Sequence, residues 1–530
     1  MILSDFPLKK VSLLMCFFLA FFLKGYPDTL VSINDLTFNS DLEKEAFLHL
    51  TDEDSVNYPA LYLAIDSSIN NTKFQEILKR INVLEVPYRS HSFSKMKESK
   101  KIKKIYRNIH AELLKKYDEK VLFSSIFSNG EYQCVTSTML YSLILHDLNI
   151  PFEIKLTPDH AYLVAYPKSE NIIMETTNPL RGTVIYNDQF KTSYVESMHK
   201  MKIISDTEYK TESVNKLFNK YFGNPEIVTL KEIAGAQYHN KALFLLQNMQ
   251  FKKAFEYMEK AYFLHPSKTN TYLLLVTLAA TLDKVGVKNE HYAGYLAKIM
   301  RFQGSLISSD QLFTLFNQLT YQQLEYEGNV EMYIRSYHKI LPAVKDSALQ
   351  AEIKFVYNYE RGRRLYNIKN YGEAMPFIKI AYGIKPKNLE TEQMFINILV
   401  DKLSKSEYNK KVGKDLIAEM EAYTVKFPQL KNKIAFKKIY LLKCLDFMDK
   451  YYYEKDVSKG EIYRKKFEEN YPSADYNFLS INKYIVRSYN SAGSCYFAKG
   501  NYKKSREMFK KGLFYVPDSR LLKNRLRIIE

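Results

Sequence analysis

The sequence has few cysteines, and they show no paired spacing. Its 530 residues contain only four, at positions 16, 134, 444 and 495. Because Cys16 lies in an apolar leader, three remain in the body of the chain, and an odd number without a repeated spacing does not indicate a disulfide framework. No Cys-x-x-Cys, His-Glu-x-x-His or His/Cys cluster occurs. The sequence therefore predicts no metal site and no cofactor.

An apolar run long enough to cross a bilayer is also lacking. Val11 to Leu23 are thirteen residues without a charge, preceded by Lys9 and Lys10. This is the length of a signal-peptide core and is short of the ~20 residues that a spanning helix needs. Residues 1–25 are therefore expected to be a signal peptide, and the protein to be exported to the periplasm or the cell surface. Because no small-x-small cleavage pair follows, the alternative is an uncleaved anchor that holds the protein outside the cytoplasm.

Basic charge is abundant but is not concentrated in one place. The formal net charge is +18, yet the Lys and Arg residues recur along the whole chain. The densest run, Lys95 to Arg107, lies in a pattern with apolar residues three and four positions apart, which is typical of the solvated side of an amphipathic helix. A nucleic-acid binder gathers its basic residues on one face, so nucleic acid ranks lowest among the partners considered.

The chain is too long for one hydrophobic core, and its pattern changes beyond residue 210. Residues 40–210 contain helical patterns and then short apolar segments of strand period, which indicates an α+β domain with N-terminal helices. Residues 233–530 contain helical patterns and no strand pattern. We expect an α+β domain followed by an all-α array.

A thiol, an imidazole and a carboxylate lie on the element types that a nucleophilic site needs. A helical pattern begins at Cys134, His160 opens an apolar strand, and Glu175 lies toward the end of the next strand. A thiol at a helix N-terminus beside an imidazolium ionises readily. If the two strands pair antiparallel around residues 167–170, the start of one lies beside the end of the other, and His160 can meet Glu175.

Other roles for the same residues remain open. The backbone N–H of Cys134 and the side chains of Asn129 and Gln133 are candidate donors to an oxyanion. A lone cysteine at the start of an apolar helix is more often a small core residue. His160 can equally be a turn residue, and Glu175 a surface residue.

The helical part repeats. Phe251, Tyr371 and Tyr502 each precede a small residue by three positions and a proline by fifteen. Further small residues stand twelve positions before those small residues, at Ala242, Gly362 and Gly493. These spacings resemble the tetratricopeptide repeat, which implies a solenoid of paired helices that binds a protein partner. From Pro342 onward the closing prolines step by 44, 42, 44 and 45 residues, which predicts helices or loops longer than those of the standard ~34-residue repeat.

Residues 125–180 resemble the transglutaminase-like superfamily, a papain-fold group with Cys, His and Asp in this order. The matching features are Gly130 to Cys134, Ile150-Pro151, His160-Ala-Tyr-Leu-Val and Glu175-Thr176. The resemblance implies a papain-like domain in which Cys134 is the nucleophile, His160 the general base and acid, and Glu175 the orienting carboxylate. Two positions depart from the pattern: Glu175 stands where Asp is usual, and Val135 stands where a Trp commonly follows the cysteine.

Two functions follow as alternatives. The first is an exported bacterial cysteine enzyme that cleaves or transfers an amide of a peptide or protein through a thioester, with the repeats holding a protein partner. The second is an assembly scaffold whose papain-like domain has lost activity. Membrane association through residues 1–25 is compatible with either function.

Overall fold

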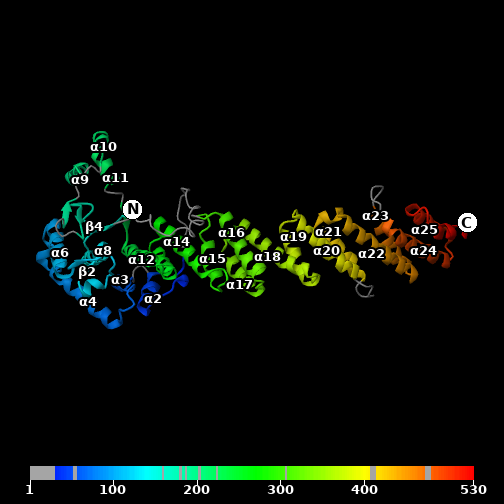
Figure 1. Ribbon diagram of the computed structural model, residues 1–530, viewed down its shortest axis with the longest axis horizontal. Helices are drawn as coiled ribbons and strands as arrows, with labels where there is room; N and C mark the ends of the chain where they lie inside the picture. The colour runs from blue at the N-terminus through cyan, green and yellow to red at the C-terminus, as the bar shows by residue number, and fades with distance from the viewer. Residues whose placement is uncertain are drawn as a thin grey trace. The chain divides into compact units, whose positions relative to one another are not determined.

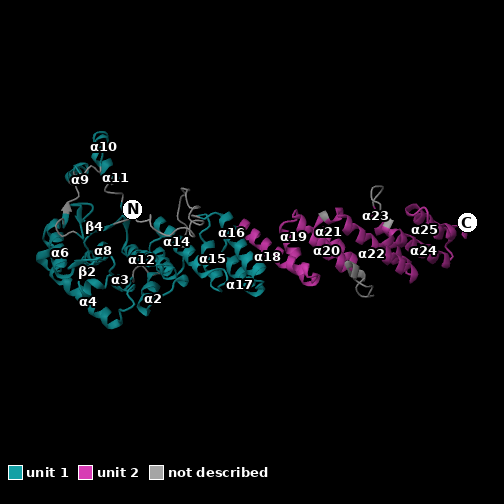
Figure 2. Ribbon diagram, viewed as in Figure 1, with its two compact units in different colours: residues 1–345 teal, residues 346–530 magenta. Residues whose placement is uncertain are grey.

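The computed structural model describes residues 30–51, 56–157, 160–177, 182–185, 188–200, 204–221, 225–304, 307–405, 413–471 and 479–529. The chain divides into two compact units, residues 1–345 and 346–530 (Figure 2). It is mostly helical, with a small sheet region in the first unit (Figure 1). The sequence predicted this order, with strands in the first part of the chain and helices after it. The predicted leader, residues 1–25, lies outside the described residues. None of the described helices combines the length and the apolarity that crossing a bilayer needs.

Short helices form the start of the first unit. They are α2 (Asp41–Leu48), α3 (Tyr58–Leu63), α4 (Asn71–Glu85), α5 (His91–Ser94), α6 (Glu98–Leu113) and α7 (Ser125–Ser128). In α6 the apolar residues Ile102, Ile105 and Ile109 are fully buried, whereas Lys103 and Lys104 are exposed. The predicted amphipathic helix is therefore confirmed, and the basic run is its solvated side.

A five-stranded antiparallel sheet packs against helix α8 (Cys134–Asp147). Its strand order is β6 (Thr183–Ile185), β5 (Ile172–Met174), β4 (Ala161–Ala165), β3 (Phe152–Leu156), β7 (Glu226–Val228). All five residues of β4 are buried, because β4 is the central strand and lies beside α8 (Figure 1). The predicted antiparallel pairing of the two apolar strands is confirmed, with Leu163 opposite Met174.

The sequence patterns did not predict β6, β7 or two further short strands. Helix α6 ends at Leu113, and the two further strands, β1 (Lys116–Tyr117) and β2 (Glu131–Tyr132), pair in parallel. Strands were not expected beyond residue 210, yet β7 pairs with β3. Segments of two or three residues are too short to show an alternating pattern, since their pairing comes from partners distant in sequence.

Three helices between β6 and β7 form a separate small cluster. They are α9 (Asp188–Lys200), α10 (Asp206–Thr211) and α11 (Val214–Tyr221), and Figure 1 shows them together beyond the sheet. Val195, Ile204, Leu217 and Phe218 form their own buried core.

The first unit continues as a helical array. Its helices are α12 (Leu230–Gln247), α13 (Phe251–Leu264), α14 (Lys268–Val285), α15 (Tyr292–Met300), α16 (Ser309–Thr320) and α17 (Val330–Ile340). Helix α12 packs against α13 and also against α3 and α8. The helices of the array therefore begin within the same compact unit as the sheet.

The second unit contains only helices among its described residues. They are α18 (Ser347–Asn367), α19 (Tyr371–Ile384), α20 (Leu389–Lys405), α21 (Gly413–Lys426), α22 (Ile434–Tyr453), α23 (Val457–Asn470), α24 (Asn482–Ala498), α25 (Tyr502–Tyr515) and α26 (Arg520–Arg527). Helices α18 and α19 pair closely, as do α24 and α25. A Cβ atom at Gly362 would overlap Ile378, and one at Gly493 would overlap the ring of Phe509. The small residues in the repeated pattern therefore permit the close approach of paired helices.

A fully buried ion pair joins the start of the chain to the array. The Lys260 Nζ of α13 lies 2.7 Å from the Glu43 Oε1 of α2, and both side chains have 0% exposure. Glu43 also accepts hydrogen bonds from the Tyr238 hydroxyl of α12 at 2.9 Å and from the Asn39 N–H at 2.6 Å. Burial lowers the pKa of Lys260, and the Glu43 carboxylate opposes this shift. Because both side chains are fully buried, water could not replace Glu43 as the partner of Lys260.

We expect Lys260→Met to lower the free energy of unfolding by about 3–5 kcal/mol, because it leaves the Glu43 carboxylate buried without its cation. Adding Glu43→Gln should recover part of that loss, since a neutral amide oxygen still accepts from Tyr238. Lys252→Met on the exposed side of the same helix is the control, with an effect within about 0.5 kcal/mol. Urea denaturation followed by circular dichroism measures all three. A loss below 1 kcal/mol for Lys260→Met would contradict the importance of the pair.

Candidate active site

Gly130 sets the approach of the chain to the candidate site. Its φ is +75°, and a Cβ atom there would lie 2.5 Å from Lys115 Cγ. The Gly130 carbonyl accepts hydrogen bonds from the N–H groups of Lys115 and Lys116 at 2.8 and 3.2 Å. A glycine is therefore required both by the left-handed backbone and by the close neighbour. The turn aligns β2 with β1 and leads into α8.

Cys134 is the first residue of α8 and is partly exposed. The preceding residue, Gln133, has an extended backbone, and its N–H donates to Thr136 Oγ1 at 2.9 Å. The Ser137 hydroxyl donates to the Gln133 carbonyl at 2.7 Å. These contacts fix the first turn of the helix. The thiol consequently lies at the positive end of the helix dipole, where a thiolate is stabilised.

His160 and Glu175 meet across the paired strands. His160 directly precedes β4 and Glu175 directly follows β5. The His160 Nε2 lies 3.1 Å from Glu175 Oε1 and 3.2 Å from Oε2. The side chain of His160 is 31% exposed and that of Glu175 is 21% exposed. The imidazole therefore faces a carboxylate on one side and remains reachable from solvent.

The Cys134 thiol lies close enough to the imidazole of His160 to have the largest influence on its titration. The proximity of Cys134, and next to it the hydrogen bond to Glu175, raise the pKa of His160 to about 10, although burial opposes them. Burial has the largest single effect and raises the pKa of Glu175, but the hydrogen bond and charge of His160 and the two hydrogen bonds of Thr177 together hold that pKa below its usual value. The histidine is thus a cation, and the glutamate an anion, at neutral pH.

Glu175 is held on both its backbone and its side chain. Its Oε1 accepts hydrogen bonds from the Thr177 hydroxyl at 2.8 Å and from the Thr177 N–H at 3.2 Å. Its carbonyl accepts from the Tyr106 hydroxyl of α6 at 2.7 Å. Its N–H donates to the Gly182 carbonyl at 2.9 Å. A carboxylate fixed in this way can orient the imidazole rather than follow it.

Thr138 ties the three segments together. It lies one helical turn beyond Cys134 and has no exposed surface. Its hydroxyl donates to the Ala161 carbonyl, next to His160, at 3.1 Å. It also lies 3.2 Å from the hydroxyl of Thr176, which directly follows Glu175. A single buried hydroxyl thereby links the segments that carry the thiol, the imidazole and the carboxylate.

The two candidate oxyanion side chains have different surroundings. The Gln133 amide is buried, donates to the Val121 carbonyl at 2.8 Å, and accepts from the Asn240 amide of α12 at 3.1 Å. The Asn129 side chain is exposed and donates to Glu131 at 2.8 Å. The structure therefore places Gln133 at the base of the helix in a fixed orientation. The Asn129 side chain, by contrast, bonds to Glu131 and not to Cys134, His160 or Glu175.

Sequence reasoning did not identify the residues that support the site. Thr138 and Asn240 were missed, as was Tyr117, whose ring packs edge-on against Tyr132 at 5.9 Å and whose side chain is 45% exposed. Burial, and next to it the charge of Cys134, raise the pKa of Tyr117 to about 12. A signal was present for Thr138, since a hydroxyl four residues after the cysteine shares its helix face. No signal in the sequence placed Asn240 or Tyr117 near the thiol.

We expect Thr138→Val to lower the free energy of unfolding by about 1–3 kcal/mol, because it leaves the buried Ala161 carbonyl without its donor while keeping the side-chain volume. Thr138→Ser retains the hydroxyl and loses only a methyl group, at a cost of about 1 kcal/mol. Chemical denaturation compares the two variants. If valine is tolerated better than serine, packing and not hydrogen bonding holds the segments together.

The carboxylate at position 175 departs from the pattern of the superfamily that the sequence resembles, and so does Val135 after the cysteine. The longer Glu175 side chain nevertheless reaches the imidazole with both oxygens. The resemblance itself remains a prediction. No protein-family model matches the chain, and a search of curated proteins finds no significant match.

Proposed function

We propose that the first unit is a cysteine-dependent acyl-transfer enzyme of the transglutaminase-like type, acting on an amide of a peptide or protein. Cys134 is the nucleophile, His160 the general base and acid, and Glu175 the residue that orients the imidazole. The observation that carries the proposal is that one imidazole hydrogen-bonds to a fixed carboxylate and lies near a thiol at a helix N-terminus. This is the geometry that activates a cysteine nucleophile.

The reaction follows from these roles. The Cys134 thiolate attacks the carbonyl carbon, a C–S bond forms, and the electron pair of the C=O bond moves to oxygen. The N–H of Cys134 is one of the unpaired donors of the helix N-terminus and can bind this oxyanion, with the Gln133 amide beside it. The C–N bond then breaks, and His160 gives its proton to the leaving amine. Water or a second amine attacks the thioester, passes a proton to His160 and releases the thiolate.

The remaining expectations belong to the same proposal. The protein is exported, and its helical array, similar to tetratricopeptide repeats, holds a protein partner or presents the substrate. A second candidate function is an assembly scaffold without catalysis. It is favoured by Val135, which stands where the superfamily commonly has tryptophan, and by glutamate in place of aspartate at position 175.

We expect iodoacetamide to alkylate Cys134 at pH 6.5 faster in the unmodified protein than in His160→Ala. The reason is that His160, with its pKa raised to about 10, remains protonated beside the sulfur and loses its proton only as the pH rises through that value. In His160→Ala the rate at pH 6.5 should fall by about tenfold or more, because the imidazolium beside the sulfur is lost. Alkylation reactions quenched at set times and analysed by peptide mapping give the rate at Cys134 as a function of pH.

The same experiment contains its own controls. Burial raises the pKa of Cys444 to about 12 and also raises that of Cys495, so neither thiol should react at pH 6.5. Peptide mapping separates Cys134 from Cys16. A Cys134 profile that matches an ordinary thiol and does not change in His160→Ala would leave only the scaffold.

A second prediction concerns the acyl-enzyme. With p-nitrophenyl acetate, we expect a burst of nitrophenolate and the gain of one acetyl group on the peptide that contains Cys134. Cys134→Ala should abolish the burst, and His160→Ala should slow it by a factor of about 10² or more, the usual effect of removing a general base. Intact-mass and peptide-mapping measurements check this. Acetylation confined to lysine side chains, with an unmodified Cys134, would contradict the proposal.

A further inference from the structure

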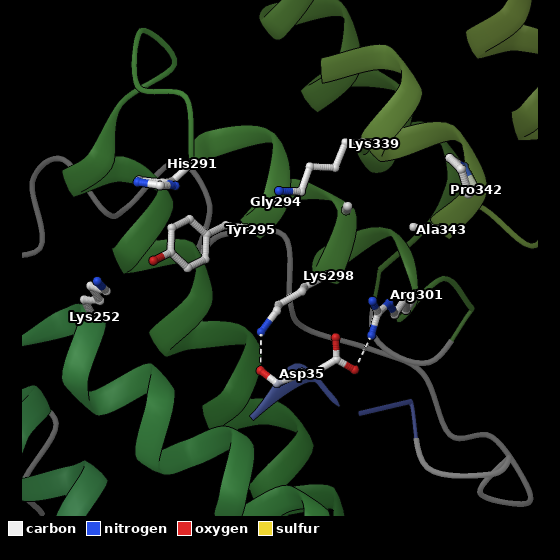
Figure 3. Close-up of a pocket in the computed structure, with 11 residues that line it drawn as sticks. Asp35, Lys252, His291, Gly294, Tyr295, Lys298, Arg301, Lys339, Pro342 and Ala343 are labelled. Atoms are coloured by element: carbon white, nitrogen blue, oxygen red, sulfur yellow. Dashed lines mark hydrogen bonds and ion pairs between the residues drawn. The ribbon is translucent and has the colours of Figure 1, made fainter. Parts of the chain in front are cut away.

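A cleft of about 490 Å³ lies in the helical array of the first unit, among α13, α15, α17, η1 (Ile33–Asp35) and η6 (Leu341–Ala343) (Figure 3). Its volume falls within the ~300–1,000 Å³ range of ordinary ligand pockets. Its lining includes four basic side chains, Lys252, Lys298, Arg301 and Lys339, and one carboxylate, Asp35. The lining therefore carries an excess of positive charge.

Two of the cations are fixed by the N-terminal segment. Arg301 Nη1 lies 2.6 Å from Asp35 Oδ2, and Lys298 Nζ donates to the Asp35 carbonyl at 3.0 Å (Figure 3). Lys298 also pairs at 2.5 Å with Glu259, whose side chain is buried behind it. Lys298 and Arg301 form the floor of the cleft, and their charge is partly neutralised by these contacts.

The positive charges of the other two residues, Lys252 and Lys339, are hardly neutralised by nearby carboxylates. Lys252 is 67% exposed, and its nearest carboxylate, Glu256, lies 3.9 Å away one turn along the same helix. Among the described residues no carboxylate pairs with Lys339, whose Cε and Nζ would each lie 3.3 Å from a Cβ atom added at Gly294. Exposed single pairs contribute only about 0–1 kcal/mol, so both ammonium groups remain available to an anion.

The arrangement of the charges indicates the shape of the ligand. Figure 3 shows Lys252 and Arg301 at opposite sides of the cleft, with Tyr295 between them and with Lys339, Pro342 and Ala343 above. Cations spread along an open cleft with apolar surface among them do not converge on one small anion. They suit an extended ligand with several carboxylates.

We propose that this cleft binds an acidic segment of a peptide or protein, whose carboxylates contact Lys252, Lys339 and the Arg301 side of the floor and whose apolar atoms pack on Tyr295. Charge complementarity of this kind provides specificity and fast association rather than high affinity. The site is separate from Cys134, and its binding does not require that the protein be an enzyme.

The test uses the full chain and a fluorescein-labelled tetraglutamate peptide, with tetraglutamine as its uncharged match, in a fluorescence anisotropy titration at low salt. We expect tetraglutamate to bind and tetraglutamine not to bind. Lys252→Gln combined with Lys339→Gln should weaken binding at least tenfold. Lys103→Gln combined with Lys104→Gln removes the same charge from exposed positions of α6 and should change binding less than twofold.

Three outcomes would overturn the proposal. The first is that tetraglutamate fails to bind the unmodified chain. The second is that the two double variants weaken binding equally, which would mean that the overall charge of +18 attracts the peptide without a specific site. The third outcome is that inorganic phosphate displaces the peptide at an equal concentration. That result would show a pocket for a single anion.

Discussion

The hydroxyl of Thr138 joins helix α8 to the two strands that carry the other candidate catalytic side chains. Its two contacts reach backbone or side-chain atoms that directly neighbour His160 and Glu175. The thiol stands four residues earlier on the same helix, so its position follows from that of Thr138. Because all of these polar atoms are buried, each lost hydrogen bond would leave a group that water cannot satisfy. The geometry of the candidate site therefore depends on how α8 is fastened to the sheet, more than on any contact among the three reactive groups.

The convergence of Cys134, His160 and Glu175 could be predicted because it required only local patterns. A glycine before an apolar helix locates the thiol, and two consecutive apolar strands meet through a short turn. The spacing of Thr138 from the cysteine places it on the same helix face, but the contacts of the supporting residues could not be predicted in this way. Thr138 lies mid-helix, where a threonine usually bonds to its own helix, and here it serves two strands instead. Strand β7 has three residues and owes its existence to β3, which precedes it by about seventy residues.

The first helix of the array also forms part of the environment of the site, which neither periodicity nor repeat spacing indicated. Gln237 of α12 accepts from the Phe123 N–H at 2.7 Å and donates to the Tyr62 carbonyl at 3.1 Å. Asn240, one turn later, donates to the Gln133 side chain. These contacts join segments more than one hundred residues apart in sequence. The segment before Cys134 is therefore bound to α12, which explains why the compact unit continues beyond the sheet into the helical array.

Glutamate at position 175 fits the backbone around it. The Tyr106 hydroxyl and the Gly182 carbonyl hold the main chain of Glu175 just past the end of β5, and the carboxylate must reach back from there to His160. It arrives with both oxygens at hydrogen-bonding distance, and Thr177 holds one of them. An aspartate on the same backbone would be shorter by one carbon–carbon bond, about 1.5 Å. Its oxygens would then fall outside hydrogen-bonding range of Nε2. The length of the glutamate side chain therefore suits the position of its backbone.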